Sequence, residues 1–185
     1  MLPITASRSA GGAGFYHQIL HRADVRAVLD DILGTPADEL DMFHPAVQLL
    51  QTFAEAGDAA NFARRVGVAD VAGTAGVADG CAPLEQVQHL ATALGAAITN
   101  PLAVPVFGAG AFEPTTVTRP VSANLAGGRT GVFVQLDAGH LGAGVNPQIG
   151  RGFVESFTTT GTPAVPAGTL SSDATAGCMG RYDPL

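Results

Sequence analysis

The chain has 185 residues, of which 46% are hydrophobic and 14% charged, and this composition is typical of a globular domain with its own core. Its formal net charge is −7 and the sequence shows no basic stripe of the kind that nucleic-acid phosphates require, so we expect no nucleic-acid partner. No apolar run reaches the roughly 18 residues of a membrane span, and the first residues lack the charged-then-apolar pattern of a signal peptide.

The first third of the chain is predicted to be helical. Apolar residues recur at helical spacing over 15–33, and Gly34 stops the pattern. A second helix is predicted to begin at Pro45, a residue suited to the first helical position, and to end at Gly57. Asp58 is then the expected N-cap of a short third helix in "AANFARRV".

Strands and helices are predicted to alternate in the rest of the chain. A weak strand of valine, alanine and glycine lies within 67–80, and a helix begins at Pro83 and ends before Gly95. The segment "TGVFVQLD" is the best strand, because its continuous apolar run is typical of a sheet covered on both faces. A last helix is predicted over about 147–159.

In the remaining segments the apolar residues follow neither helical nor strand spacing. Residues 96–130 are predicted to be a long connection, and the tail from Gly161 is predicted to be irregular. The alternation indicates an α/β fold with parallel strands. Two or three strands make a small sheet, so we expect one incomplete α/β domain over 1–185. Within it, 1–66 is mainly helical, 67–166 holds the strand and helix units, and 167–185 is an irregular tail.

Two residues at strand ends are candidates for chemistry. Asp79 follows the weak strand, and His140 follows the strong strand. If the two strands are neighbours, the carboxylate can fix the tautomer of the imidazole while the other ring nitrogen takes a proton from a nucleophile. The spacing alone leaves a second interpretation open, in which Asp79 caps a helix and His140 sits in a turn.

Four segments, which together span about 43–166, bear on this choice: "FHPAVQLLQTFAEAGDAANFARR", "GVADGCAPLEQVQHLATALG", "SANLAGGRTGVFVQLDAGHLG" and "FVESFTTTGTPAVP". In their order and approximate spacing they resemble the C-terminal half of bacterial extracellular lipases and esterases of the α/β-hydrolase superfamily. The resemblance implies a partial α/β-hydrolase fold, with Asp79 of "GVADGCAP" as the triad acid and His140 as the triad base. It also implies a secreted or cell-surface location, an ester or lipid substrate, and neither a metal nor an organic cofactor.

The nucleophile of that family is missing from the chain. The serine of the fold stands in a G-x-S-x-G turn, and the 185 residues contain no such motif. Neither Ser7 nor Ser9 has glycines at both required positions. We therefore expect a C-terminal segment of a serine carboxylic-ester hydrolase, inactive by itself and completed by an N-terminal half that brings the serine and the oxyanion hole.

A non-catalytic protein is the alternative. A truncated or decayed homologue would keep its helical face for binding a partner, and an unpaired parallel sheet edge would favour self-association.

Several other residues have a functional and a structural interpretation. His17 and His21 have a spacing of four, which can chelate a metal on a helix, but no third ligand is evident and an exposed polar face explains them better. Asp58 is a second candidate acid, although capping explains it better. His44 is expected to close a turn, and His89 to lie opposite the apolar side of its helix.

The chain has two cysteines, Cys81 and Cys178. They form either one disulfide that closes a large loop or two reduced thiols, and the sequence does not decide between these. A Cys81 nucleophile paired with His140 is disfavoured, because no basic neighbour lowers the thiol pKa.

Overall fold

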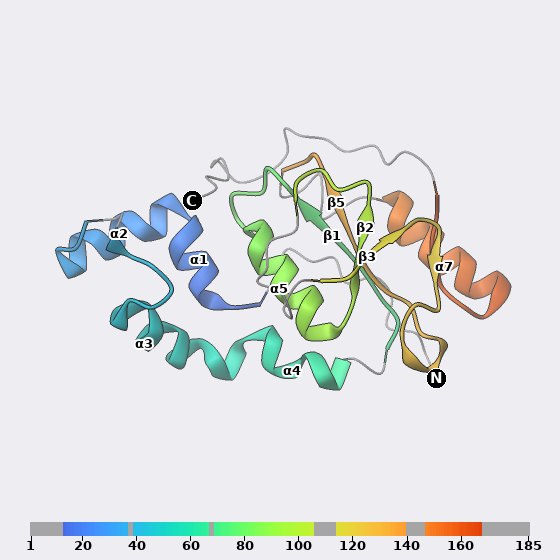
Figure 1. Cartoon of the computed structure of the whole chain (residues 1–185), viewed down its shortest axis with the longest axis horizontal. Helices are drawn as coiled ribbons and strands as arrows, with labels where there is room; N and C mark the ends of the chain where they lie inside the picture. Colours follow the sequence, from blue (N-terminus) through green and yellow to red (C-terminus); the bar gives the residue numbers. More distant parts are fainter. Residues whose placement is uncertain (1–12, 37–38, 67–68, 106–113, 140–146, 168–185) are drawn as a thin grey trace.

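The computed structural model describes residues 13–36, 39–66, 69–105, 114–139 and 147–167 (Figure 1). None of the helices in these ranges is long and apolar enough to cross a membrane. In chain order the elements are α1 (Phe15–His21), α2 (Ala23–Leu33), α3 (Pro45–Ala54), the 3-10 helix η2 (Glu55–Gly57), α4 (Ala59–Val66), β1 (Val71–Gly76), α5 (Leu84–Leu94), β2 (Ala97–Asn100), β3 (Thr116–Thr118), β4 (Val121–Ser122), the 3-10 helix η4 (Ala126–Gly128), β5 (Gly131–Leu136), α7 (Pro147–Thr160) and β6 (Ala164–Val165).

The main sheet has four parallel strands in the order β1-β5-β2-β3. The longest pairing joins β1 to β5, from Val71 opposite Gly131 to Gly76 opposite Leu136. The predicted α/β class with a small parallel sheet is therefore confirmed. The two strands that precede Asp79 and His140 are direct neighbours.

Helices cover both faces of this sheet (Figure 1). Alternate residues of β5 point to opposite sides, as in any strand. Val132 and Val134 belong to a core cluster that contains Phe153 of α7, whereas Phe133 belongs to a cluster that contains Leu84 of α5. The continuous apolar run of β5 thus has a packing partner on each side, as the sequence predicts.

The small residues of β1 are a consequence of this packing. Gly73 lies directly opposite Phe133 in the β1–β5 register. A Cβ atom at position 73 would overlap the Phe133 ring. One of the small residues that weaken the strand by propensity is thus required because the Phe133 ring occupies the space of a side chain.

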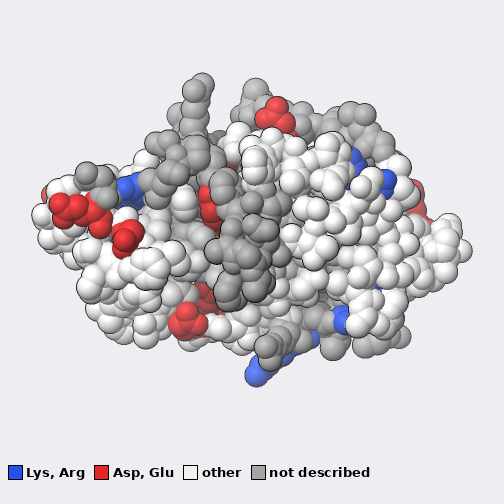
Figure 2. Space-filling view, in the orientation of Figure 1, with Lys and Arg blue, Asp and Glu red and all other residues white. Residues whose placement is uncertain are grey.

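Helices α1 to α4 form a separate layer beside α5 (Figure 1). This layer has its own small core, made of Ile19, Leu20, Leu40 and Val47. Both α4 and α1 contact α5. In Figure 2 acidic side chains gather at the α2 end of this layer, and basic side chains are scattered over the face shown.

The prediction of one helix over 15–33 is wrong at one point. Arg22 has extended backbone, with φ −100° and ψ 111°, and separates α1 from α2. Side chains offset the helical hydrogen bonds lost there: Arg26 Nη1 donates to the carbonyl oxygen of Leu20 at 3.3 Å, and Arg22 pairs with Asp24. The stop at Gly34 is confirmed, because this residue has a left-handed φ of 62°.

The prediction that 96–130 is only a long connection is also wrong. This segment supplies β2 and β3 to the main sheet, and β4, which pairs with β6 of the predicted irregular tail. Strands of two to four residues are too short to show a period in the sequence. The predicted helices that begin at Pro45, Ala59, Pro83 and Pro147 are confirmed within one or two residues.

Candidate functional site

Asp79 lies in the turn between β1 and α5. Its side chain is buried, with 4% of the residue exposed. The carboxylate oxygen Oδ1 accepts hydrogen bonds from the backbone N–H groups of Cys81 at 2.8 Å and Ala82 at 2.9 Å. These bonds fix the orientation of the carboxylate at the carboxyl end of β1, where reactive groups of α/β sheets are found.

The turn of Asp79 is hydrogen bonded to the segment that leads to His140. Val77 N donates to the carbonyl oxygen of Leu136 at 2.9 Å, and Ala78 N donates to that of Ala138 at 3.1 Å. Asp79 is therefore the residue after Ala78, and Ala78 is hydrogen bonded to Ala138, two residues before His140. His140 itself lies outside the described residues, so its side chain stays a prediction.

Cys81 is disulfide-bonded and has no thiol to ionise. The interpretation of Cys81 as a nucleophile is therefore excluded for this state of the protein. Cys178, the second cysteine of the sequence, lies outside the described residues.

The structure brings a third imidazole to the pair His17 and His21. The ring centroid of His17 on α1 lies 5.8 Å from that of His21 and 5.7 Å from that of His89 on α5. His89 was expected opposite the apolar side of its helix, and on that side it lies in the seam between α5 and α1. Gly14 makes this seam narrow, because a Cβ atom there would lie 2.6 Å from Nδ1 of His89.

No group of three or more His, Cys, Asp or Glu side chains in the described ranges is arranged to hold a metal ion. The other two imidazoles nevertheless act on His17. Burial, together with the nearby His89 and His21, lowers the pKa of His17 from 6.5 to about 3, although the carboxylate of Asp58 acts in the opposite direction. His17 is therefore neutral at pH 7 while α1 is docked.

Asp58 joins the first helices to one another. It caps α4 as predicted, with Oδ1 accepting from Ala60 N at 2.9 Å. It also accepts from the N–H groups of Gly14 (2.8 Å to Oδ2) and Phe15 (3.2 Å) at the start of α1, and from Nε2 of Gln51 on α3 (3.0 Å). Burial raises the pKa of Asp58, but these hydrogen bonds outweigh it and lower the pKa below its usual value.

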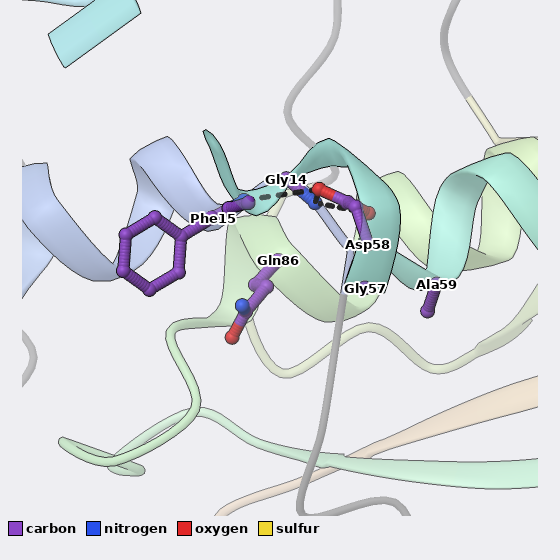
Figure 3. A pocket seen from close by; sticks show the side chains of 7 residues that line it. Gly14, Phe15, Gly57, Asp58, Ala59 and Gln86 are labelled. Carbon is purple, nitrogen blue, oxygen red and sulfur yellow. Dashed lines mark hydrogen bonds between the residues drawn. The ribbon is translucent and has the colours of Figure 1, made fainter. Parts of the chain in front are cut away.

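A cavity of about 310 Å³ lies beside this carboxylate (Figure 3). The residues that line it are Gly14, Phe15, Ala54, Gly57, Asp58, Ala59 and Gln86. Both carboxylate oxygens of Asp58, the charged side chain of the lining, already accept hydrogen bonds from helix starts and from Gln51. This arrangement favours capping over the role of a second catalytic acid.

The strongest candidate site is thus the carboxyl edge of β1 and β5, where Asp79 is buried and its turn is bonded to the segment before His140. Comparison of the chain with family models, with curated proteins and with solved structures gives no match.

Proposed function

We propose that the chain is the C-terminal segment of a serine carboxylic-ester hydrolase and that it supplies the triad acid Asp79 and the triad base His140. The observation that carries this proposal is the meeting of the two strand-end turns. Ala78 and Ala138 share a backbone hydrogen bond, and the next residue along the first turn is a buried, oriented carboxylate. The resemblance of 43–166 to lipases and esterases adds to it.

In the proposed reaction His140 acts as general base and then as general acid. It takes the proton of a serine hydroxyl while the serine oxygen bonds to the ester carbonyl carbon, and it then gives that proton to the departing alcohol. Water hydrolyses the acyl-serine by the same proton transfers. Asp79 holds the imidazole in one tautomer. Because the chain has no G-x-S-x-G turn, the serine and the oxyanion hole come from other sequence.

The burial of β1 supports the proposal that this strand belongs to a larger sheet in the complete enzyme. All six residues of β1 are buried, and its two faces contact α5 and α7. One edge pairs with β5, and no strand within the described ranges pairs with the other. A parallel strand buried on both faces is typical of the interior of a sheet, which fits an N-terminal half that adds strands at this edge and shares the substrate pocket.

The first test measures the pKa of the His140 imidazole by NMR in the chain and in Asp79→Asn. A carboxylate next to an imidazole favours the charged ring, so the substitution is expected to lower the His140 pKa by about 1 unit. Asparagine keeps the side-chain oxygen that accepts from Cys81 and Ala82, so the turn is expected to survive. The matched control is Asp137→Asn, which removes an exposed carboxylate nearer in sequence to His140.

An unchanged His140 pKa in Asp79→Asn, or an equal change in the control, would contradict the pair. Hydrolysis of p-nitrophenyl butyrate then tests the missing nucleophile. The chain alone is expected to show no more hydrolysis than Asp79→Asn and His140→Ala. Activity that disappears in both variants would support the hydrolase class but would place a nucleophile within these 185 residues.

The alternative, a non-catalytic protein that binds a partner, has one observation in its favour. Large apolar side chains are exposed on the helical layer, where Phe43 is 77% and Phe53 76% exposed. Exposed apolar side chains of this size can bind another protein. The edge of β1 that no described strand covers is a second place where self-association could occur. The NMR test separates the two proposals, because a partner-binding protein does not require Asp79 and His140 to interact.

A further inference from the structure

We propose that His17, His21 and His89 form a pH-sensitive latch that holds α1 against α5 at neutral pH and releases it in mild acid. The three rings, hereafter the imidazole latch, span the seam between the helical layer and the α/β unit. This proposal does not depend on the hydrolase assignment, because it concerns how α1 is held.

The packing of the rings in the seam between α1 and α5 disfavours a protonated imidazole. The rings of His17 and His89 are 5.7 Å apart between centroids and nearly perpendicular, at 84°. The Nδ1 atoms of both rings are buried and have no hydrogen-bond partner within the described part of the chain. A proton on His17 would therefore add a charge to a ring whose Nδ1 has no acceptor among the described residues and that lies beside a second imidazole.

Charged and titratable groups from each packed element act on the latch. Tyr16 of α1 contacts both His17 and His89 through its ring. The carboxylate of Asp58 favours a charged His17, but burial and the other imidazoles outweigh it, so the pKa of His17 falls to about 3. Burial also lowers the pKa of His21, where Glu85 of α5 acts against it and Arg26 of α2 acts with it. Glu55 is the remaining acidic neighbour, facing His89.

The latch is connected to the turn of Asp79. Gln18, one residue after His17, donates from Nε2 to the carbonyl oxygen of Cys81 at 2.9 Å and to Oε1 of Gln86 at 2.6 Å. The N–H of Cys81 in turn donates to Asp79. Ala13 N also donates to the carbonyl oxygen of Gln86. Release of α1 would therefore remove contacts that hold the start of α5 and the carboxylate turn before it.

The expected size of the effect follows from proton linkage. A histidine released to solvent has a pKa of about 6.5, whereas docked His17 has a pKa of about 3. The released state therefore binds more protons between these values, and its population rises as the pH falls. Between pH 7 and pH 5, His17 alone raises the equilibrium constant for release by about 25-fold.

Hydrogen exchange of the full chain, followed by mass spectrometry at pH 7 and pH 5 with labelling times scaled for intrinsic exchange, tests the latch. We expect the opening of α1 to increase by about 25-fold at pH 5 while β5 stays protected. In His17→Gln the part of the increase that His17 contributes, about 25-fold, should be lost. His44→Asn is the matched control: it removes a histidine outside the latch, keeps a capping side chain before α3, and should retain the full increase.

Two results would overturn the proposal: the same pH response in His17→Gln as in the unmodified chain, or an equal increase in β5, which would indicate global unfolding. If His17→Gln opens α1 at pH 7, then His89→Gln, which changes the α5 side of the seam, gives the deciding comparison. A pH response in His89→Gln equal to that of the unmodified chain would also overturn the latch, and a reduced one would support it.

Discussion

Replacing Phe133 by alanine is expected to lower the free energy of unfolding by about 4 kcal/mol. Phe133 is 1% exposed, lies in β5 between β1 and β2, and belongs to the core cluster shared with α5. The substitution removes an aromatic ring from the centre of the sheet and leaves a cavity that neighbouring strands cannot fill. Urea unfolding followed by circular dichroism measures the change. Phe43→Ala, at a position 77% exposed, is the control and should change stability by less than about 0.5 kcal/mol.

The same ring explains the composition of β1, and a double-mutant cycle checks that explanation. Gly73→Ala is expected to cost about 1–3 kcal/mol, because its Cβ atom would overlap Phe133. In the Phe133→Ala background the added methyl group has space, so the two effects should not be additive. Additive values would show that Gly73 is required for a reason other than the ring.

The helices of this protein can be predicted from the sequence because their signals are local. Glycines end α2 and α5 in left-handed conformation, and Asp58 caps α4 by a bond to its own second neighbour. The strands behave differently. β5 is long and apolar enough to be recognised, but β2 and β3 are strands only because they pair with β5 and with each other. Their short sequences carry no comparable signal.

The candidate site and the imidazole latch likewise combine features that local sequence predicts with features that depend on how distant segments pack. That β1 and β5 are neighbours was only one possibility from the sequence, because β2, β3 and β4 lie between them in the chain. The structure pairs the two strands, and this places Asp79 near the segment before His140. The imidazole latch could not be predicted in full. A spacing of four shows that His17 and His21 share a helix face, whereas His89 joins them only through the docking of α1 on α5. Gly14, whose missing side chain permits this docking, is understood only once the fold is known.

Replacing Asp58 by alanine is expected to lower the free energy of unfolding by about 3 kcal/mol at pH 7, because one carboxylate serves two helix starts and Gln51. Alanine would leave the N–H groups of Gly14, Phe15 and Ala60 without this acceptor. Urea unfolding measures the loss, and a loss below about 0.5 kcal/mol would contradict the structural role.

The pH dependence of stability separates Asp58 from His17, because their contributions are lost in different ranges. The folded-state pKa of Asp58 is lowered, so its contribution is present above about pH 4 and is lost as the pH falls through that folded value. The pKa of folded His17 is also lowered, to about 3. For a histidine this means that the unfolded chain takes up the proton first, and stability falls from about pH 6.5 downward. Asp58→Asn should therefore keep the loss of stability between pH 6.5 and pH 5 and weaken the loss below pH 4, whereas His17→Gln should do the reverse.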